Sequence, residues 1–459
     1  MLAFLKAVSD NIWGWPMMLL FLGVGLIYTV RLRGLQFRFL PEAFRCLSRQ
    51  NGQNGISPYA ALCTSLAATI GTGNIVGVGT ALCAGGPGAL FWMLVAAFLG
   101  MGTQYAEGFL AAKYRKKGCF GGPFAYIEGG LGKKWKWMAS LYAFIGVSVG
   151  LLGVGTVTQV TSITGAVDSF FSSKTVFFLQ GRPISGAAII AGALVTFAAG
   201  AVLMGGATRI TKVCECFVPL MSAAYLIFAA ILLICHLREI PEAVLLIVKS
   251  AFCPKAALGA AAGISIKTAM RMGIGRGVFT NEAGLGTTAI AAASSNEEVP
   301  VYQGLTSMTG TFIDTVVICT ITGLCLVLTG AWNAPVENVA ITDYAWRHGL
   351  PWTESLSSFV LMVCLCFFAF ATVIGWNFYA EACLRYLTGE NSRAKLLYRM
   401  AYLCVIAISP YISATIAWEL ADILNGIMAL PNLTALLFLQ KDVISDSKRW
   451  ISAGRKKII

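Results

Sequence analysis

A glycine-rich stretch inside a hydrophobic segment constrains the fold of this chain more than any other feature. Residues 69–93 read TIGTGNIVGVGTALCAGGPGALFWM, and seven of the eighteen residues from Gly71 to Gly88 are glycine. Each glycine weakens a helix by about 1 kcal/mol relative to alanine, so we expect the helix to break at Gly71–Asn74. Lipid cannot satisfy the N–H and C=O groups of a broken helix, so the break must face protein or a polar cavity. The stretch indicates either a site for a small charged ligand or close packing of small residues between spans.

The composition places this stretch in a membrane. Apolar residues make up 57% of the chain and charged residues 12%, and the mean hydropathy is +0.74. Soluble domains carry about 25% charged residues, so we predict an all-α, polytopic membrane protein. Residues 12–30 are too long for a signal-peptide core and lack a small-residue cleavage motif, so they form the first predicted span. At about 20 residues for each crossing, eleven spans fit: 12–30, 56–83, 88–112, 137–165, 184–204, 213–235, 257–294, 302–330, 356–383, 397–416 and 420–440.

The basic residues follow the predicted loops and do not form a patch for nucleic acid. Of the 34 Lys and Arg residues, 24 fall on one side of the predicted spans, among them Arg31, Arg33, Lys113, Lys133 and Lys456, and seven fall on the other. The positive-inside rule assigns the more basic side to the cytoplasm. We therefore expect a multi-pass protein of the plasma or inner membrane, with its N-terminus outside and its C-terminus in the cytoplasm.

A second glycine-interrupted span matches the first in position. Residues 257–294 are too long for one simple helix and carry glycine at 273, 275, 277, 284 and 286. Two interrupted spans at corresponding positions of inverted halves indicate the central site of a secondary transporter. We predict four parts: a peripheral first span and interfacial helix (1–55), two inverted five-span blocks (56–236 and 256–440) and a basic cytoplasmic tail (441–459).

Charged residues inside the spans are the next candidates, because at bilayer depth they need partners or contact with water. The second interrupted span contains Arg276 and Glu282. They either pair with each other and stabilise the break, or take part in gating or ligand binding. Glu107 lies near the end of its span, where we expect a pair with Lys113 or Arg115.

Four further polar or aromatic residues lie within the spans. Asp314 is either a hydrogen-bond hub or a coupling site, and Gln159 either bonds a neighbouring helix or contacts a ligand. Thr372 and Trp376 are one turn apart, so they share a helix face. A hydroxyl beside an aromatic ring suits a cation and a small substrate, although a buried threonine often bonds its own helix.

Together these groups match an amino-acid zwitterion and a cation. The N-termini of half-helices present N–H groups and partial positive charge to a carboxylate, and unwound carbonyls with Thr or Asn oxygens form a cage for Na+. The chain lacks the GxxxxGK[ST] loop of ATP-hydrolysing proteins and a convergent nucleophile and base, so we do not expect an enzyme or an organic cofactor. A passive channel is disfavoured by the inverted repeat within one chain. A proton-coupled carrier stays open, because Glu282 and Asp314 can titrate.

Four motifs carry a family resemblance: ATIGTGNIVGV (68–78), GGPGALFWM (85–93), RGVFTNEAGLG (276–286) and FAFATVIGWNFYAEA (368–382). In these motifs the chain resembles the alanine or glycine:cation symporter family, also called sodium:alanine symporters. The resemblance implies a leucine-transporter-like 5+5 inverted repeat preceded by one peripheral helix. It also implies Na+ as the coupling ion and alanine or glycine as the substrate, with glutamine as an alternative.

The resemblance also implies site residues by motif position. Around Gln159 the sequence TQVTSIT departs from the family's commoner Q-A-N-S, which leaves the side-chain selectivity open. The implied Na+ ligands are Thr69, Asn74 and Thr372. The implied substrate contacts are Gly71, Thr72, Gly73, Asn74, Gln159, Phe279, Asn281, Gly284, Thr372 and Trp376.

Overall fold

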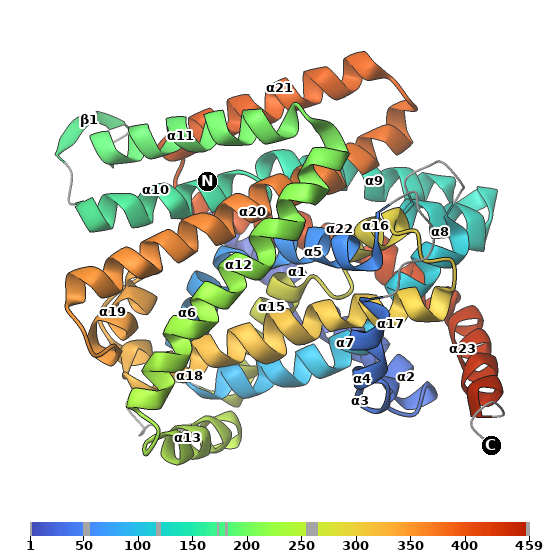
Figure 1. Cartoon of the computed structure of the whole chain (residues 1–459), viewed down its shortest axis with the longest axis horizontal. Helices are drawn as coiled ribbons and strands as arrows, with labels where there is room; N and C mark the ends of the chain where they lie inside the picture. Colours follow the sequence, from blue (N-terminus) through green and yellow to red (C-terminus); the bar gives the residue numbers. More distant parts are fainter. Residues whose placement is uncertain are drawn as a thin grey trace.

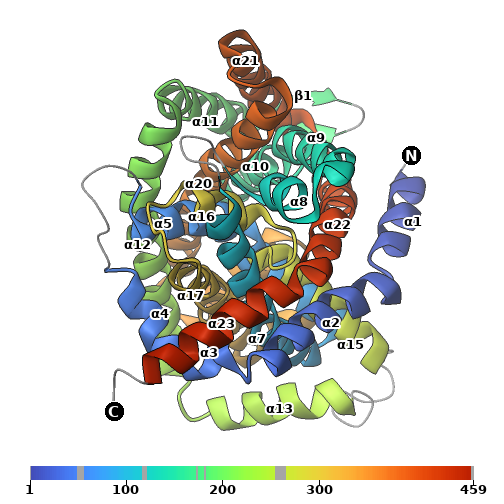
Figure 2. The same cartoon turned by 90° about the vertical axis from the view of Figure 1, so that its right-hand side faces the viewer.

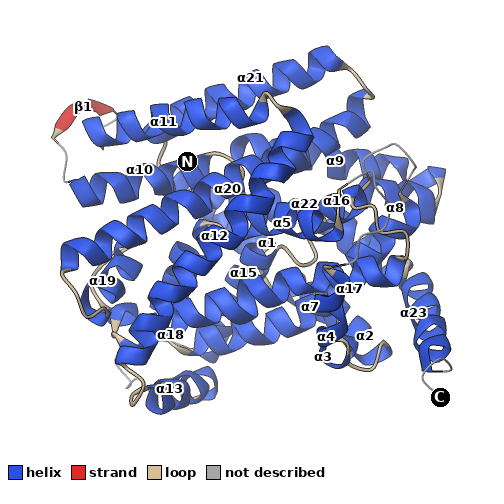
Figure 3. Cartoon of the chain, viewed as in Figure 1, coloured by secondary structure: helices blue, strands red, loops and turns tan. Residues whose placement is uncertain are grey.

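The described residues form helices joined by short loops, with a single β-hairpin (Figures 1 and 3). The structure is a computed structural model that describes residues 2–48, 56–115, 121–171, 174–179, 182–253 and 265–455. The hairpin pairs β1 (Thr175–Leu179) with β2 (Arg182–Ser185) in the connection between the fourth and fifth predicted spans.

Among the described residues, eight helical segments are long and apolar enough to cross a membrane, and a ninth is bent. The bent span joins α5 (Pro58–Thr69) through η1 (Gly73–Gly77) to α6 (Val78–Gly85), with a 55° change in direction. The eight others are α1–α2 (Leu2–Ile12 and Trp15–Arg31), α7 (Gly88–Tyr114), η2–α9–α10 (Lys133–Trp135, Lys136–Leu152 and Val157–Phe171), α11 (Gly186–Leu203), α12 (Gly206–Cys235), α17–η4–α18 (Pro300–Thr311, Phe312–Cys319 and Thr320–Leu328), α20 (Glu354–Thr388) and α22 (Ala414–Phe438).

The other two predicted spans hold shorter helices. The span predicted at 257–294 contains α15 (Ile266–Asn281) and α16 (Thr287–Ser294), and that predicted at 397–416 overlaps α21 (Ser392–Ile408) and η6 (Ser409–Tyr411). Residues 257–264 of the first lie outside the described residues. The prediction of an all-α polytopic membrane protein is confirmed.

Short helices lie around the long ones. The segment predicted to be an interfacial helix contains two short helices, α3 (Leu35–Arg38) and α4 (Leu40–Cys46). The connections also contain α8 (Pro123–Leu131), α13 (Ile240–Phe252), η5 (Ala331–Asn333), α19 (Val339–Gly349) and α23 (Gln440–Arg455).

Helix α7 lies in the middle of the bundle against α2, α15 and α17 (Figure 2). Small residues let the backbones approach: a Cβ on Gly273 would lie 2.2 Å from the Ala89 carbonyl oxygen, and one on Gly304 would lie 2.7 Å from the Tyr105 carbonyl oxygen. Such contacts are typical of helix packing in membranes. They hold α7 directly beside the interrupted helix α15–α16.

Three predicted spans are interrupted near the centre of the molecule. Those at residues 70–72 and 282–286 are the two glycine breaks that the sequence predicts. The third, at Gly153–Thr156 between α9 and α10, was not predicted. A further irregularity is the π-helix η4 between α17 and α18, a feature often found at functional sites.

Candidate functional site

The break between α5 and η1 brings two backbone N–H groups to neutral oxygen acceptors. Gly71 N–H donates to Oδ1 of Asn74 at 2.9 Å, and Thr72 N–H donates to Oε1 of Gln159 at 3.3 Å. All four residues are buried. The amide oxygens satisfy the broken backbone without any charge, so a negatively charged group would be a stronger acceptor for the same N–H groups.

Thr372 of α20 touches the same break. Its Oγ1 donates to the Phe368 carbonyl at 3.1 Å and lies 3.4 Å from the Ile70 carbonyl oxygen. A Cβ on Gly71 would lie 2.4 Å from Thr372 Oγ1 and 3.2 Å from Gln159 Oε1. The structure thus brings together three predicted site residues from three helices, and only a glycine fits at position 71.

A group of oxygen atoms extends from this break to the π-helix η4. The amide Nδ2 of Asn74 donates to Asp314 Oδ1 at 2.7 Å, and the Thr315 hydroxyl donates to Asp314 Oδ2 at 2.7 Å. Asn281 Nδ2 at the end of α15 donates to Thr315 Oγ1 at 3.1 Å. Asp314 is fully buried, and no described Lys or Arg lies within ion-pair distance of it. Asp314 therefore joins both interrupted spans, a position that its sequence context did not reveal.

The break between α15 and α16 is filled by an internal carboxylate. Oε1 of Glu107 accepts from the N–H groups of Gly284 and Gly286 at 3.0 and 3.1 Å, and from Asn432 Nδ2 at 2.7 Å. Oε2 accepts from the Thr288 hydroxyl at 3.2 Å. An anion at the N-terminus of α16 is favoured by the helix dipole as well as by these bonds.

The predicted pair of Glu107 with Lys113 or Arg115 is therefore wrong. Lys113 instead lies 2.8 Å from Asp446 of α23, and Arg115 donates to the Glu297 carbonyl at 2.8 Å. Glu107 is one to two turns deeper along α7 than these basic residues, beside the glycines of the break, and it bonds to them.

Gly284 lies away from the break at Gly71. Its φ of +95° is a conformation that glycine adopts most readily, and a Cβ there would lie 2.6 Å from a ring carbon of Phe21 in α2. The structure places this predicted substrate contact against α2 and Glu107, with its N–H already bonded.

Arg276 and Glu282 do not pair with each other. Arg276 forms an ion pair with Asp422 of α22, at 3.2 Å between NH2 and Oδ2, and its guanidinium lies over the ring of Trp418. Glu282 accepts from Trp376 Nε1 at 3.0 Å and from the Thr287 hydroxyl at 2.5 Å. The alternative of an Arg276–Glu282 pair is wrong, and the actual partners link α15 to α22 and α20.

The interruption between α9 and α10 forms a further wall beside Trp376. A Cβ on Gly155 would lie 2.7 Å from the Cβ of Trp376, and the Tyr402 hydroxyl donates to the Gly155 carbonyl at 2.8 Å and to the Val373 carbonyl at 2.7 Å. Sequence reasoning missed this break, although Gly150, Gly153 and Gly155 gave a signal of the same kind as the other two.

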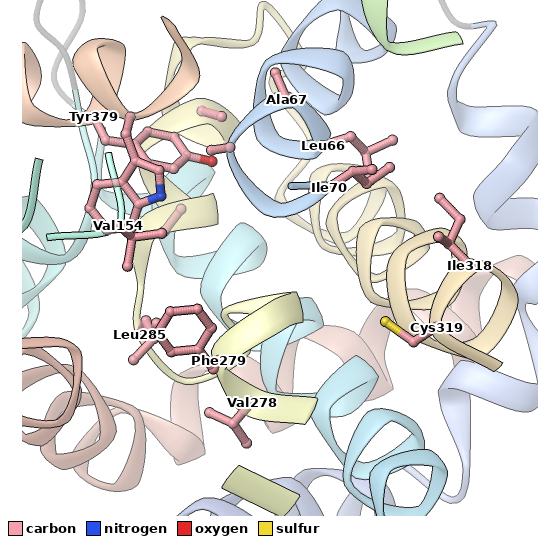
Figure 4. Packing of buried hydrophobic residues seen from close by; sticks show 14 of the residues in the cluster. Leu66, Ala67, Ile70, Val154, Val278, Phe279, Leu285, Ile318, Cys319 and Tyr379 are labelled. Atoms are coloured by element: carbon pink, nitrogen blue, oxygen red, sulfur yellow. The ribbon is translucent and has the colours of Figure 1, made fainter. Parts of the chain in front are cut away.

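The remaining predicted residues lie at the same centre or next to it. A Cβ on Gly73 would lie 3.2 Å from the Thr280 hydroxyl, and the ring of Phe279 packs against that of Trp418 in a tilted arrangement, with 5.4 Å between ring centres. Thr69 is the buried last residue of α5. All ten predicted substrate residues are buried. Figure 4 shows apolar side chains around it: Leu66, Ala67 and Ile70 from the end of α5, Val278 and Phe279 from α15, Leu285 from the second break, Ile318 and Cys319 from η4, Val154 and Tyr379.

Interrupted helices around an enclosed polar centre define a multi-pass membrane transporter with discontinuous spans. A family model described as Sodium:alanine symporter family matches residues 1–458. The chain is 45% identical to an uncharacterized transporter of Haemophilus influenzae, over 97% of this chain and 95% of the relative. It is 38% identical to the sodium/alanine symporter AgcS of Methanococcus maripaludis, over 96% of each chain. It is 32% identical to the probable sodium/glutamine symporter GlnT of Bacillus subtilis, over 98% of this chain and 91% of the relative.

The chain belongs to the sodium:alanine symporter family, as its four motifs predicted. It is a transmembrane amino-acid symporter, and membership of the family implies coupling to Na+.

Proposed function

We propose that this protein imports a small neutral amino acid, alanine or glycine, together with Na+ by alternating access. One observation carries the proposal: two N–H groups at the Gly71 break are held by neutral amide oxygens, next to an oxygen cluster that contains a carboxylate. The first group suits the carboxylate of an amino acid, and the second suits a cation.

The substrate carboxylate binds at the α5–η1 break and not at the α15–α16 break. At α5–η1, Asn74 and Gln159 supply uncharged acceptors that rotate away when a charged acceptor arrives. At α15–α16, Glu107 already supplies the charge. A second anion there would be repelled by a buried carboxylate that has no compensating cation in the described part of the chain.

Na+ is held beside the same break by hard oxygen ligands. Thr372 and the Ile70 carbonyl lie on one flank, next to Thr69 at the end of α5, and Asn74 lies on the other. The carboxylate of Asp314 supplies negative charge next to Asn74. A buried carboxylate without a cationic partner is costly even when it accepts hydrogen bonds, and a bound cation offsets that cost.

The walls of the site favour a small side chain. Trp376 is fully buried with its indole N–H bonded to Glu282, and the Gly155 backbone lies against its Cβ. Phe279 and Trp418 fill the side toward α22. Glutamine is the second candidate, because the relative GlnT is named a probable sodium/glutamine symporter and the Gln159 amide lies within reach of the centre.

The transport cycle requires the two interrupted spans to move relative to the other helices. We infer eleven spans, with 56–236 and 256–440 as inverted blocks and the N-terminus outside. In that orientation the Arg276–Asp422 pair lies on the outer side of the centre and acts as a gate between α15 and α22. A membrane-impermeant thiol reagent should then reach Cys253 from outside the cell, since this exposed cysteine follows α13 on the outer face.

The function is tested by uptake of labelled alanine, glycine and glutamine into proteoliposomes, with a Na+ gradient and a pH gradient imposed separately. We expect alanine and glycine uptake to follow the Na+ gradient. The rival function, a proton-coupled carrier, draws on the buried carboxylates Glu107, Glu282 and Asp314, and it predicts equal uptake with a pH gradient in the absence of Na+.

A further inference from the structure

We infer that the side of the protein next to α2 and α23 carries a binding site for the phosphate headgroup of an anionic phospholipid. A cavity of about 660 Å³ opens there. None of its lining residues belongs to the transport site, and no step of the proposed transport cycle uses it. Its lining residues are Arg31, Leu32, Arg33, Arg38, Lys448, Ile451 and Ser452.

Four of the lining residues are cations that come from separate parts of the chain. Arg31 ends α2, Arg33 lies in the turn after it, Arg38 ends α3, and Lys448 lies in α23. Figure 2 shows α23 crossing beside α3 and the end of α2. All four side chains belong to exposed residues. Like charges gathered at one cavity repel each other, so the arrangement favours an anion between them.

Among the described residues, none of these four cations forms an ion pair with a carboxylate. The acidic residues of α23 are directed elsewhere: Asp446 pairs with Lys113 at 2.8 Å, and Asp442 accepts from the Tyr114 hydroxyl at 2.5 Å. No carboxylate in the described part of the chain therefore compensates the positive charge of the cavity.

The surroundings of the cavity identify a lipid and not a soluble anion. On α2, Leu26 and Val30 are 52% and 64% exposed, and Phe37 of α3 is 56% exposed. Such exposed apolar side chains are expected to face acyl chains in a membrane protein. Trp450 packs against the rings of Phe39 and Tyr302 at 5.8 and 5.6 Å, and tryptophan is enriched at the headgroup level. Cations at that level beside an apolar surface match both parts of a phospholipid.

The wall formed by α23 is fixed to the bundle. Val443 is fully buried, and the Ser447 hydroxyl bonds the Tyr105 hydroxyl of α7 at 2.7 Å. The helix that carries Lys448 is thus anchored in the cavity wall by its neighbouring residues. Four positive charges exceed the single charge of one phosphodiester, so a lipid with two phosphates, such as diphosphatidylglycerol, should bind more tightly than phosphatidylglycerol.

The test compares the full-length protein with an Arg38→Gln/Lys448→Gln variant. A matched control, Lys133→Gln/Lys134→Gln, removes the same charge from two exposed residues on η2, away from the cavity. Lipid binding is measured in detergent by native mass spectrometry, with diphosphatidylglycerol, phosphatidylglycerol and phosphatidylcholine titrated separately. Each basic residue near an anionic lipid surface contributes about 1 kcal/mol, or about fivefold. We expect the dissociation constant for the anionic lipids to rise about 25-fold in the cavity variant and to stay unchanged in the control.

Three results would overturn the inference. One is equal binding of anionic lipid by the cavity variant and the wild type. Another is equal binding of phosphatidylcholine and the anionic lipids by the wild type. The third is competition by millimolar inorganic phosphate as strong as that by the lipids, which would assign the cavity to a soluble anion. The two wild-type titrations decide the matter even where the variant does not fold, and neither depends on which amino acid is transported.

Discussion

The two breaks are both rich in glycine, but the acceptors of their backbone N–H groups differ in charge. At Gly71 the backbone N–H groups are bonded to uncharged amide oxygens of Asn74 and Gln159, whereas at Gly284 and Gly286 they are bonded to the carboxylate of Glu107. The first break can exchange its acceptors for a ligand's carboxylate. The second carries its own anion within the fold. Glycine content therefore identifies a broken helix, and the charge of the acceptor decides whether that break is free to bind.

This difference also gives the two interrupted spans different roles. The α5–η1 break, with Thr372 and Asp314 beside it, holds substrate and cation in our proposal. The α15–α16 break ties two other helices together, since Glu107 comes from α7 and Asn432, which bonds both Glu107 and the Gly284 carbonyl, comes from α22. A movement of the α16 half of this span would thus be passed to α7 and α22.

The largest expected effect is that of Gly71→Ala. The added methyl would lie 2.4 Å from Thr372 Oγ1 and 3.2 Å from Gln159 Oε1. Overpacking costs about 1–3 kcal/mol, which corresponds to about a fivefold to 150-fold change in binding. We expect alanine uptake to be lost while the protein still inserts, measured as initial uptake in proteoliposomes with matched protein content.

Two neighbouring glycines act as controls for Gly71→Ala. Gly73→Ala places its methyl 3.2 Å from the Thr280 hydroxyl and should reduce uptake less, and Gly77→Ala has no atom within 4 Å of the new methyl and should keep most of it. Equal activity of all three variants would show that the α5–η1 break is not the ligand site.

The second prediction concerns Glu107→Ala. This change removes the acceptor from two backbone N–H groups, an amide and a hydroxyl, and each buried donor left unsatisfied costs about 1–3 kcal/mol. We expect the apparent melting temperature to fall by at least about 5 °C, whereas Glu42→Gln, in an exposed pair with Arg45, should leave it unchanged. The folded fraction of Glu107→Ala should bind alanine with nearly wild-type affinity. Loss of alanine affinity at unchanged stability would move the ligand to the α15–α16 break.

Both glycine breaks could be predicted from the sequence, and their partners could not. A glycine run weakens a helix by itself, so Gly71 and Gly284 are visible without knowledge of any neighbour. The acceptors lie far along the chain: Gln159 is 87 residues from Thr72, and Glu107 is 177 residues from Gly284. Glu107 was misread because its sequence neighbours Lys113 and Arg115 were the nearest charges along the chain.

Other features were missed because they depend on packing. Asp422 was not singled out as the partner of Arg276, since the two residues are 146 positions apart. The π-helix η4 places Asp314 and Thr315 against Asn74 and Asn281. Its sequence from Phe312 to Cys319 contains no glycine or proline, so no such residue marks it in the sequence. Thr372 and Gln159 were candidates already as polar residues within predicted spans, and the family resemblance implied that they contact substrate; the structure brings both to Gly71.

The third prediction sharpens the assignment of the cation to the first break. Thr372→Val keeps the shape of the side chain and removes one oxygen ligand. A hydrogen bond or contact to a charged group is worth about 1.5–3 kcal/mol, so we expect the Na+ concentration for half-maximal uptake to rise at least about tenfold. Thr372→Ser should stay near the wild type. Thr388→Val removes a hydroxyl that bonds its own helix in the same way, on the exposed end of α20, and serves as the control. An unchanged Na+ dependence in Thr372→Val would remove this hydroxyl from the ion site.

The smallest effect is expected at the outer half of α15, where Arg276 meets Asp422. The two side chains are 20% and 14% exposed, so solvent screens part of their attraction, and the guanidinium keeps its contacts with Phe279 and Trp418 when the carboxylate is removed. A double-mutant cycle with Arg276→Gln and Asp422→Asn, read out as the alanine exchange rate, should give a coupling energy of about 1 kcal/mol. The exposed pair Arg45–Glu42 should give about 0–0.5 kcal/mol in the same assay.

A second cycle with Arg276→Gln and Glu282→Gln distinguishes a gate between α15 and α22 from an ion pair that stabilises the α15–α16 break. Coupling in the second cycle and none in the first would mean that Arg276 stabilises the α15–α16 break itself. The electrostatic contrast between the two breaks would then hold for only one half of this span.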